Sequence, residues 1–279
     1  MKKTPFFDIH IQLGAKISLF GGYQMPIHYS SVRQEHLAVR QNLGVFDISH
    51  MGEFVVEGSQ AFDLLQLICS NDISKLIPGK AQYNYLPNNQ GGVVDDLIVY
   101  QLQNEKYLLV VNASNIEKDW NHIERQSKKF NVKLYDASEK KAVLAIQGPK
   151  SLTAMKSICD AELDQLAHYS HTTTAFAGVK NVLVATTGYT GAGGIEIYFD
   201  VSDAEKIWKA VMEAGANFGI LPVGLAARDT LRLEMGYCLY GNDIDDTTSP
   251  FEAGLGWITK FSKDFVNSEA LAKEKEAGP

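Results

Sequence analysis

The sequence predicts an α+β fold. Segments with the alternation of β-strands and segments with helical periodicity are interspersed along the 279 residues, without the strand–helix–strand rhythm of a parallel sheet. No internal repeat, linker or low-complexity stretch divides them. With 45% hydrophobic and 21% charged residues, a chain of this length buries enough surface to fold without a metal or a disulfide, as one large domain or as two smaller ones.

The first expected helix covers residues 31–43, where apolar residues recur at helical spacing. Gly44 follows it in the position of a C-terminal cap. Residues 45–58, VFDISHMGEFVVEG, are expected to form strand and turn, and a short helix should follow over residues 59–69.

Residues 82–113 have the strongest strand character and predict a meander. The strands QYNYL, VVDDLIVY and KYLLVVNA are separated by turn residues such as NNQGG. An amphipathic helix should begin at Asn115. Its apolar face is marked by Ile116, Trp120, Ile123 and Phe130.

A second set of elements begins with the strand AVLAIQGP, which Gly148 and the following proline end. The strands NVLVATTGY and GIEIYFD come next. A helix is then expected to start with a capping box formed by Ser202 and Glu205 and to end at Gly215. The charged pattern of residues 267–279 predicts one more helix.

Charge and cysteine content narrow the class of protein. The formal net charge is -7 and like charges form no long run, so we expect neither a nucleic-acid nor a membrane partner. Cys69, Cys159 and Cys238 are too few and too widely spaced for a disulfide framework, which favours a reducing compartment. The start of the chain does not read as a signal peptide and no apolar run is long enough to span a membrane, so a cytoplasmic location is expected.

The stretch GGVVDDLIVY places Asp95 and Asp96 inside a run of strand-forming residues. Because strand residues alternate between faces, one of the two carboxylates should point toward a buried or cavity-facing side. A buried carboxylate is unfavourable without a partner or a role, so this pair is a candidate for chemistry. The alternative is an acid near a turn that binds the preceding NNQGG loop.

The stretch TTGYTGAGGIEIYF combines several glycines with Glu196. Glycines let the backbone approach a ligand or another strand closely, and Glu196 should point away from the side of Ile195 and Ile197. A phosphate-binding loop is disfavoured, since no Gly-Lys-Ser/Thr follows and the glycines precede a strand rather than a helix. A tight turn without a ligand remains the alternative.

Arg228 and Arg232 share one face of an otherwise apolar helical segment, LPVGLAARDTLRLEMGY. Each either pairs with a nearby acid or holds a ligand carboxylate. His168 and His171 have no further metal ligands near them in the sequence, so no metal site is expected. Neither a Gly-x-Ser-x-Gly elbow nor a dinucleotide-binding fingerprint occurs, which disfavours hydrolase and dehydrogenase functions.

These stretches, together with FGGYQMPIHYSS, GVFDISHMGEF, VVNASN and GLGW in this order, resemble the glycine cleavage system T-protein (aminomethyltransferase) family along nearly the whole chain. The resemblance implies the family's folate-binding fold, with two intertwined N-terminal domains. One would consist of residues 1–46 and 141–265, and the other would be an inserted α+β domain of residues 47–140. Residues 266–279 would begin the linker to a C-terminal β-barrel domain that is absent from this chain.

For the activity, the resemblance implies transfer of an aminomethyl group from the lipoyl arm of the H-protein to tetrahydrofolate, with release of ammonia. Asp96 corresponds to the family's catalytic aspartate, Glu196 to a glutamate that binds the pterin, and Arg228 to an arginine of the folate cavity. The other expected folate-binding residues are Met51, Tyr83, Asp95, Tyr100, Asn112, Tyr189 and Trp257. The expected partners are therefore the lipoylated H-protein and folate.

This sequence departs from the family pattern in two respects, and related families with the same fold offer alternative functions. Ala192 and Gly193 stand where many members carry an acidic pair, and the C-terminal domain supplies further folate contacts in the family, so this chain is expected to fold without necessarily being active. Flavin-linked demethylases share the fold, but no flavin fingerprint occurs here. Folate-binding relatives linked to iron–sulfur assembly and RNA modification carry Lys-Gly-Cys-Tyr where this chain has MGYC at residues 235–238. Those relatives and a non-catalytic folate-binding module remain the alternatives.

Overall fold

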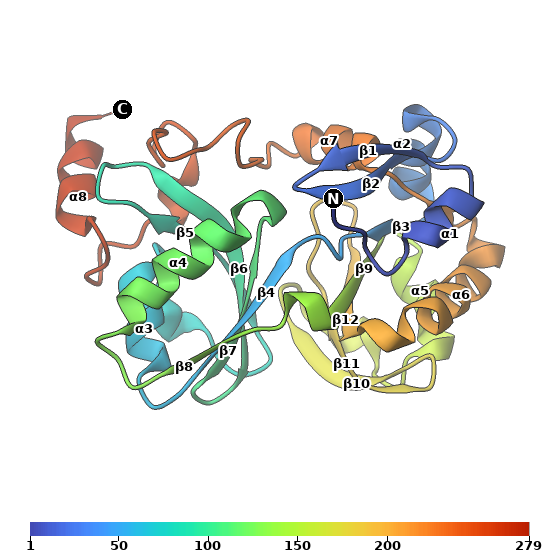
Figure 1. Ribbon diagram of the computed structural model, residues 1–279, viewed down its shortest axis with the longest axis horizontal. Helices are drawn as coiled ribbons and strands as arrows, with labels where there is room; N and C mark the ends of the chain where they lie inside the picture. Colours follow the sequence, from blue (N-terminus) through green and yellow to red (C-terminus); the bar gives the residue numbers. More distant parts are fainter. Residues whose placement is uncertain (279) are drawn as a thin grey trace. The chain divides into compact units, whose positions relative to one another are not determined.

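The computed structural model describes residues 1–278. The chain divides into two compact units, each built from two separate segments. Unit 1 comprises Met1–His50 and Glu139–Tyr237, and unit 2 comprises Met51–Ser138 together with the segment that begins at Cys238 (Figure 1). Each unit has its own sheet and its own helices, and this mixture confirms the predicted α+β class.

Unit 1 is organised around a six-stranded sheet with the order β10-β11-β12-β9-β3-β13. Its strands are β3 (Gly44–Asp47), β9 (Lys141–Gln147), β10 (His171–Phe176), β11 (Val179–Ala185), β12 (Gly194–Asp200) and β13 (Leu221–Pro222). Neighbouring strands are antiparallel except β3 and β13, which are parallel. The hairpin and helices that complete the unit are β1 (Lys16–Phe20), β2 (Tyr23–His28), α1 (Phe7–Gln12), α2 (Val32–Gln41), α5 (Ser151–Met155), α6 (Ala204–Gly215) and α7 (Leu225–Glu234).

The core of unit 1 explains the apolar runs of the sequence. Every residue of β9 after Lys141 is buried, as expected for a central strand that is covered on both faces. Ile146 of β9 and Ile195 of β12 belong to one apolar cluster with Ile207 and Trp208 of α6. Burial of this sheet against the amphipathic helix stabilises the platform that carries Glu196.

Unit 2 contains a five-stranded antiparallel sheet with the order β5-β6-β7-β4-β8. Its strands are β4 (Gly52–Glu57), β5 (Ala81–Pro87), β6 (Val93–Gln103), β7 (Lys106–Val111) and β8 (Lys133–Asp136), and its helices are α3 (Ala61–Ile68), α4 (Ile116–Ser127) and α8 (Ser268–Ala277). Since β5, β6 and β7 are consecutive antiparallel neighbours, the predicted meander is confirmed.

One face of this sheet is covered by α3 and α4. Leu64 of α3 and Ile123 of α4 share an apolar cluster with Leu97 and Val99 of β6. The odd-numbered residues of β6 in this stretch therefore point toward the two helices, and the even-numbered ones point to the opposite face.

The segment after Tyr237 packs on the opposite face, beside Tyr85 of β5. It forms a second apolar cluster of Tyr85, Val93, Ile244, Leu255 and Ile258. The structure here differs from the division expected from the resemblance, which assigned residues 141–265 to the first domain. The physical reason is the burial of these apolar side chains against the β5–β6 hairpin, which groups this segment with unit 2.

The predicted helices are confirmed within residues 1–278, and Pro279, the end of the last predicted helix, lies outside the described residues. Two of the expected end signals are wrong. Ser31 precedes α2 as its N-cap, because its side chain accepts a hydrogen bond from the Gln34 amide. Gly44 is the first residue of β3 and not a cap. A Cβ at Gly44 would lie 2.4 Å from a methyl group of Val223, so close packing explains this glycine.

The capping box expected at Ser202 and Glu205 is also wrong. Asp203 is the N-cap of α6 and makes no side-chain cap bond, whereas Ser202 lies in the preceding 3-10 turn Val201–Asp203. The Asp200 side chain accepts from the Ser202 amide and initiates that turn. The expected end of the helix at Gly215 is confirmed, since Gly215 is the last residue of α6, although the left-handed conformation that ends the following 3-10 turn falls on Gly219.

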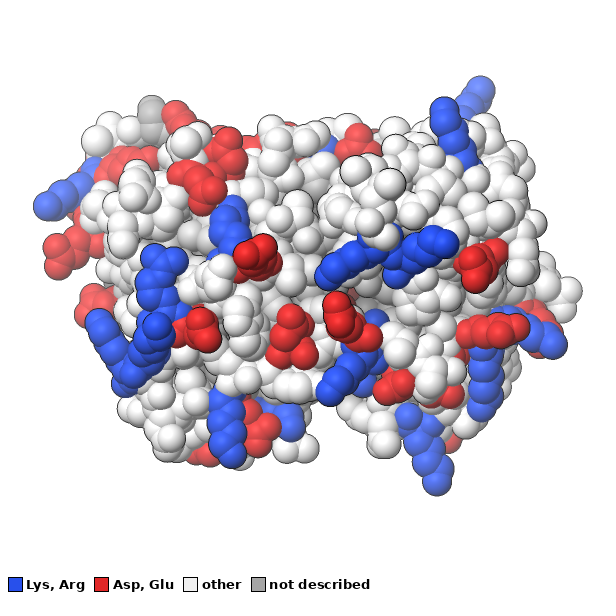
Figure 2. Space-filling view, viewed as in Figure 1, with Lys and Arg blue, Asp and Glu red and all other residues white. Residues whose placement is uncertain are grey.

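Acidic and basic side chains are interspersed on the face shown in Figure 2. Among residues 1–278, no helix has both the length and the apolar character needed to cross a bilayer.

Candidate active site

Asp95 and Asp96 lie in β6 and point to opposite faces of the sheet of unit 2. Asp95 is paired across the sheet with Leu86, which belongs to the cluster under α3 and α4, and has no exposed surface. Asp96 is paired with Tyr85 on the opposite face and is partly buried. The expectation from strand alternation is therefore confirmed, and Asp95 is the fully buried member of the pair.

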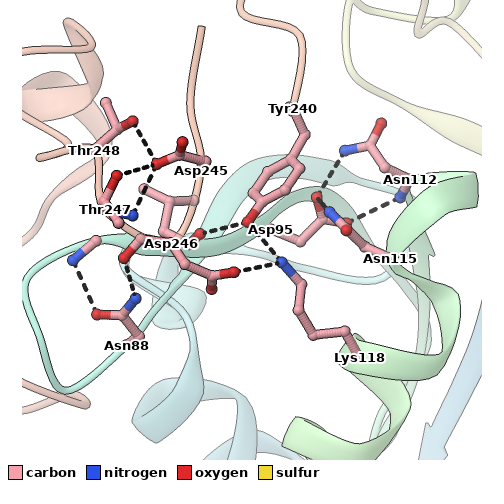
Figure 3. Close-up of polar contacts among 12 residues, drawn as sticks. Asn88, Asp95, Asn112, Asn115, Lys118, Tyr240, Asp245, Asp246, Thr247 and Thr248 are labelled. Atoms are coloured by element: carbon pink, nitrogen blue, oxygen red, sulfur yellow. Dashed lines mark hydrogen bonds and ion pairs between the residues drawn. The ribbon is translucent and has the colours of Figure 1, made fainter. Parts of the chain in front are cut away.

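The Asp95 carboxylate is held by two asparagines (Figure 3). Its Oδ1 accepts from Asn112 Nδ2 at 2.9 Å and from Asn115 Nδ2 at 2.7 Å, and its Oδ2 accepts from the Asn112 amide at 3.0 Å. The amides of the NNQGG loop bind Asn88 Oδ1 instead, so the turn-proximal explanation of the acidic pair is wrong.

Asp96 is held by Tyr83 and Asn112 on the other face. The Tyr83 hydroxyl donates to Oδ2 at 2.8 Å, and Asn112 Nδ2 donates to Oδ1 at 2.8 Å. Burial and the negative charge of Asp95 raise the pKa of Asp96 from 3.8 to about 7, against the opposing effect of these two hydrogen bonds. Asp96 is therefore able both to accept and to release a proton near neutral pH.

An aromatic surface adjoins Asp96. The rings of Tyr83 and Trp257 are stacked, with their centroids 6.1 Å apart and an interplanar angle of 28°. Trp257 lies in the 3-10 turn Leu255–Ile258 and is 63% exposed. A carboxyl group beside an accessible flat surface can act on a planar ligand that stacks there.

The segment around Tyr240 and Asp246 fixes the start of β6 (Figure 3). The Tyr240 hydroxyl donates to the Val93 carbonyl at 3.1 Å, and Lys118 of α4 donates to Tyr240 at 2.6 Å and to Asp246 at 3.2 Å. A Cβ on Gly92 would lie 1.9 Å from the Asp246 carbonyl oxygen, so only glycine allows this approach.

In unit 1, Glu196 of β12 is turned away from the core that Ile195 and Ile197 enter, which confirms its predicted direction. Its neighbours on the adjacent strands are Ala145 and Ala185, which have small side chains. Glu196 Oε2 accepts from the Thr187 hydroxyl at 2.5 Å and from the Tyr198 hydroxyl at 3.3 Å. This carboxylate is oriented on a rigid strand and is only 6% exposed.

The glycines that precede β12 allow close backbone packing. A Cβ on Gly188 would lie 2.0 Å from Gln147 Oε1, and one on Gly194 would lie 2.2 Å from the Ile146 carbonyl oxygen. The loop is further held by a hydrogen bond of 2.9 Å from the Thr190 hydroxyl to Gln147. Of the two uses expected for these glycines, approach to another strand is confirmed at both positions.

Arg228 and Arg232 of α7 have different environments. Arg232 makes the ion pair that the sequence allowed, with Asp229 at 2.7 Å. The Arg228 guanidinium lies 4.6 Å from the ring centroid of Tyr189, which in turn stacks on Tyr237 at 5.8 Å. Burial lowers the pKa of Arg228, and the nearby Tyr189 and Glu196 oppose this shift. Arginine keeps its charge even so, and a charged, planar group is presented beside Glu196.

Sequence reasoning missed two residues near Arg228. Arg40 binds the backbone of the neighbouring segments, and His50 interacts electrostatically with Arg228. Arg40 of α2 donates to the carbonyls of Thr190 and Leu231 and so ties the glycine-rich loop to α7. His50 has 1% exposure, and burial together with the charge of Arg228 lowers its pKa to about 4, so it is neutral at pH 7. No pattern in the sequence identifies either residue, because both contacts join segments far apart in the chain.

The structure brings the expected site residues together in two groups, each described within its own unit. Asp95, Asp96, Tyr83, Asn112 and Trp257 belong to unit 2, and Glu196, Arg228 and Tyr189 belong to unit 1. Tyr100 lies on the same face of β6 as Asp96 and is fully buried, and Met51, just before β4, is partly buried. Within residues 1–278, no group of His, Cys, Asp and Glu side chains is arranged as metal ligands would be.

Comparison with known proteins places this geometry in a family context. The family model described as GCVT N-terminal domain matches residues 6–263. The chain is 58% identical over 278 residues to an aminomethyltransferase of Flavobacterium psychrophilum, covering 100% of this chain and 77% of that protein. It is 57% identical over 280 residues to an aminomethyltransferase of Bacteroides fragilis, with the same coverage of 100% and 77%.

Solved structures show the same similarity. The glycine cleavage system aminomethyltransferase T from Bartonella henselae superposes with a TM-score of 0.91 and 33% identity, covering 100% of this chain and 76% of that one. The heterotetrameric sarcosine oxidase from Corynebacterium sp. U-96 matches with a TM-score of 0.50 and 16% identity, over 69% of this chain and 94% of that one. The second likeness concerns the fold alone.

Proposed function

The chain belongs to the GCVT N-terminal domain family and is a homologue of aminomethyltransferases, and from this premise we propose that it is a tetrahydrofolate-dependent aminomethyltransferase of glycine cleavage. The proposed reaction takes the aminomethyl group from the lipoyl arm of the H-protein, releases ammonia and forms 5,10-methylenetetrahydrofolate. The observation that carries the proposal is Asp96, whose pKa is raised to about 7 by burial and by Asp95 beside the aromatic rings of Tyr83 and Trp257.

The residues of unit 1 fit a reduced pterin. Glu196 offers a buried carboxylate between alanines, and such a group accepts hydrogen bonds from adjacent ring N–H and amino donors. The stacked Tyr189 and Tyr237, with Arg228 over Tyr189, suit a flat ring. Tetrahydrofolate supplies the nucleophilic nitrogens that accept the one-carbon group.

Asp96 is assigned the proton transfers and part of the charge stabilisation. Moving the aminomethyl carbon from sulfur to the two accepting nitrogens breaks its C–S and C–N bonds and forms two new C–N bonds. Two protons leave the accepting nitrogens, and the departing sulfur and the departing amino group gain one each, which gives a thiol and ammonia. A carboxyl group with a pKa near 7 can take and return such a proton. As a carboxylate, it also stabilises positive charge that develops on the carbon between sulfur and nitrogen. Tyr83 and Asn112 hold its two oxygens in fixed positions for both tasks.

Calorimetric titration of the chain with tetrahydrofolate, under reducing and oxygen-free conditions, tests the folate part of this proposal. Glu196→Gln is expected to weaken binding by about 10-fold or more, because the amide presents a donor where the pterin also presents donors. Glu205→Gln, an exposed substitution on α6, is the matched control and should bind as the parent does. Equal affinity of the parent and Glu196→Gln would refute the assignment of Glu196 to the pterin.

A further inference from the structure

Asp119 of α4 is a buried carboxyl group to which the proposed reaction assigns no role. It lies three residues after Ile116 and four before Ile123, on the face of the helix that packs against the sheet. Asp119 has no exposed surface, and no described donor reaches Oδ1 or Oδ2. An ionised carboxylate without donors is strongly unfavourable in such a place, whereas the neutral acid is tolerated.

The neighbour that can accept the proton of Asp119 is Asp95. Asn115, the residue before α4 and one turn before Asp119, donates to Asp95 Oδ1 at 2.7 Å, so Asp95 lies against this end of the helix. Burial and, after it, the negative charge of Asp95 raise the pKa of Asp119 to about 11. Of the two side chains, Asp95 accepts hydrogen bonds from Asn112 and Asn115, whereas Asp119 accepts none from the described residues. The shared proton therefore belongs to Asp119, and Asp95 is the carboxylate of the pair.

The charges around Asp119 are consistent with this assignment. Asp95 faces it from β6, and its charge, together with that of Asp96 on the opposite face of the sheet, disfavours the ionisation of Asp119. Lys118, its neighbour on α4, has the opposite effect, but its ammonium group is bound to Tyr240 and Asp246 (Figure 3). Asp119 is thus left without a cationic partner of its own among the described residues.

We propose that Asp119 is a positioning residue for Asp96: as a neutral acid it donates a hydrogen bond to Asp95 and fixes that carboxylate. Asp95 in turn holds Asn112 through the backbone amide at 3.0 Å and the side-chain amide at 2.9 Å. The side-chain amide of Asn112 also donates to Asp96 Oδ1 at 2.8 Å and to the Asp96 backbone carbonyl at 3.1 Å. The buried pair therefore acts on the reactive carboxyl through one asparagine, and only this last step rests on the proposed function.

Two substitutions separate a hydrogen-bond donor from a negative charge at position 119. Asp119→Asn keeps a donor toward Asp95 at every pH, and Asp119→Leu keeps the approximate size but removes the donor. Glu124→Gln, on the exposed face of α4, is the matched control. If Asp119 is a neutral donor, Asp119→Asn should have the kcat of the parent, and Asp119→Leu should have a lower kcat.

The protonation state is measured directly by infrared difference spectroscopy at pH 8.5, where Asp96 is ionised. The parent is expected to show the carbonyl stretch of a protonated carboxylic acid, which Asp119→Asn removes and Glu124→Gln retains. Absence of that band from the parent, or its survival in Asp119→Asn, would overturn the proposal. This measurement needs no turnover, so it decides the state of Asp119 even if the proposed function fails.

The positioning role is measured by the kinetics of tetrahydrofolate-dependent ammonia release from the aminomethylated H-protein. Asp119→Leu is expected to lower kcat about 10-fold or more, because small displacements of a reacting group are amplified in the rate. Its KM for tetrahydrofolate should stay within about twofold of the parent value, since the pterin residues of unit 1 are unchanged. Asp119→Asn should restore kcat. Equal kcat values for the Asn and Leu variants would show that donation to Asp95 has no influence on Asp96.

Discussion

Replacing Asp96 with asparagine is expected to change how the stability of unit 2 depends on pH. In the folded chain, burial and Asp95 raise the pKa of Asp96 from 3.8 to about 7. The folded state therefore binds this proton more tightly than the unfolded state. The stabilisation from the protonated side chain is fully present below about pH 4 and is lost as the pH rises through about 7.

The size of this pH-dependent change in folding free energy follows from the two pKa values of Asp96. A rise in pKa from 3.8 to about 7 corresponds to about 4 kcal/mol of folding free energy that the parent loses between pH 4 and pH 8. Asparagine does not titrate and escapes this loss. The single oxygen of the asparagine side chain can accept from Tyr83 or from Asn112 but not from both. This loss of one hydrogen bond lowers the free energy of unfolding of the variant by about 1.5–3 kcal/mol at every pH in this range.

Urea unfolding at a series of pH values measures this difference. With Trp208→Phe in both proteins, the remaining tryptophans are Trp120 and Trp257 of unit 2, so fluorescence reports on that unit. The free energy of unfolding of Asp96→Asn, relative to its parent, should rise by about 4 kcal/mol from pH 4 to pH 8. A difference that is constant with pH, or that falls, would refute the raised pKa of Asp96.

Three further substitutions test other parts of the structure. Lys263→Met should destabilise unit 2 by about 1–3 kcal/mol in urea unfolding, because the ammonium group donates to two backbone carbonyls at the end of α3; unchanged stability would show that water replaces it. Gly92→Ala should lower the melting temperature and speed proteolysis after Tyr237, since its Cβ would lie 1.9 Å from the Asp246 carbonyl oxygen; a protease-resistant variant would contradict this packing. Arg228→Met should weaken tetrahydrofolate binding about 10-fold to 100-fold in calorimetry, with exposed Arg33→Met as the control, and equal losses in both would point to a general charge effect.

Local patterns in the sequence were sufficient to predict the elements and the direction of several side chains. The alternation of β6 indicated that Asp95 and Asp96 face opposite sides, and the alternation of β12 gave the direction of Glu196. These predictions depend only on the two-residue period of a strand. Helix ends were less accurate, because Gly44 owes its identity to contact with Val223, a residue distant in the chain.

What the sequence did not reveal are contacts between distant segments. Asn112 was expected only as a folate-binding residue, and its hydrogen bonds to both Asp95 and Asp96 depend on the pairing of β6 with β7. Asp119 did leave a signal, because it is the acid inside the apolar stripe of Ile116 and Ile123, but that signal was not recognised. A buried acid on the apolar face of a helix is worth examining for a protonated partner.

The most direct test of the proposed function compares the parent with Asp96→Asn in the presence of aminomethylated H-protein and tetrahydrofolate, with ammonia release and methylenetetrahydrofolate formation followed together. We expect both proteins to bind tetrahydrofolate with similar affinity, the parent to form the two products in equal amounts, and the variant to be slower by about 100-fold or more. Equal turnover by the two proteins would remove Asp96 from the reaction. A parent that binds tetrahydrofolate and releases no ammonia would contradict the proposed activity of this chain.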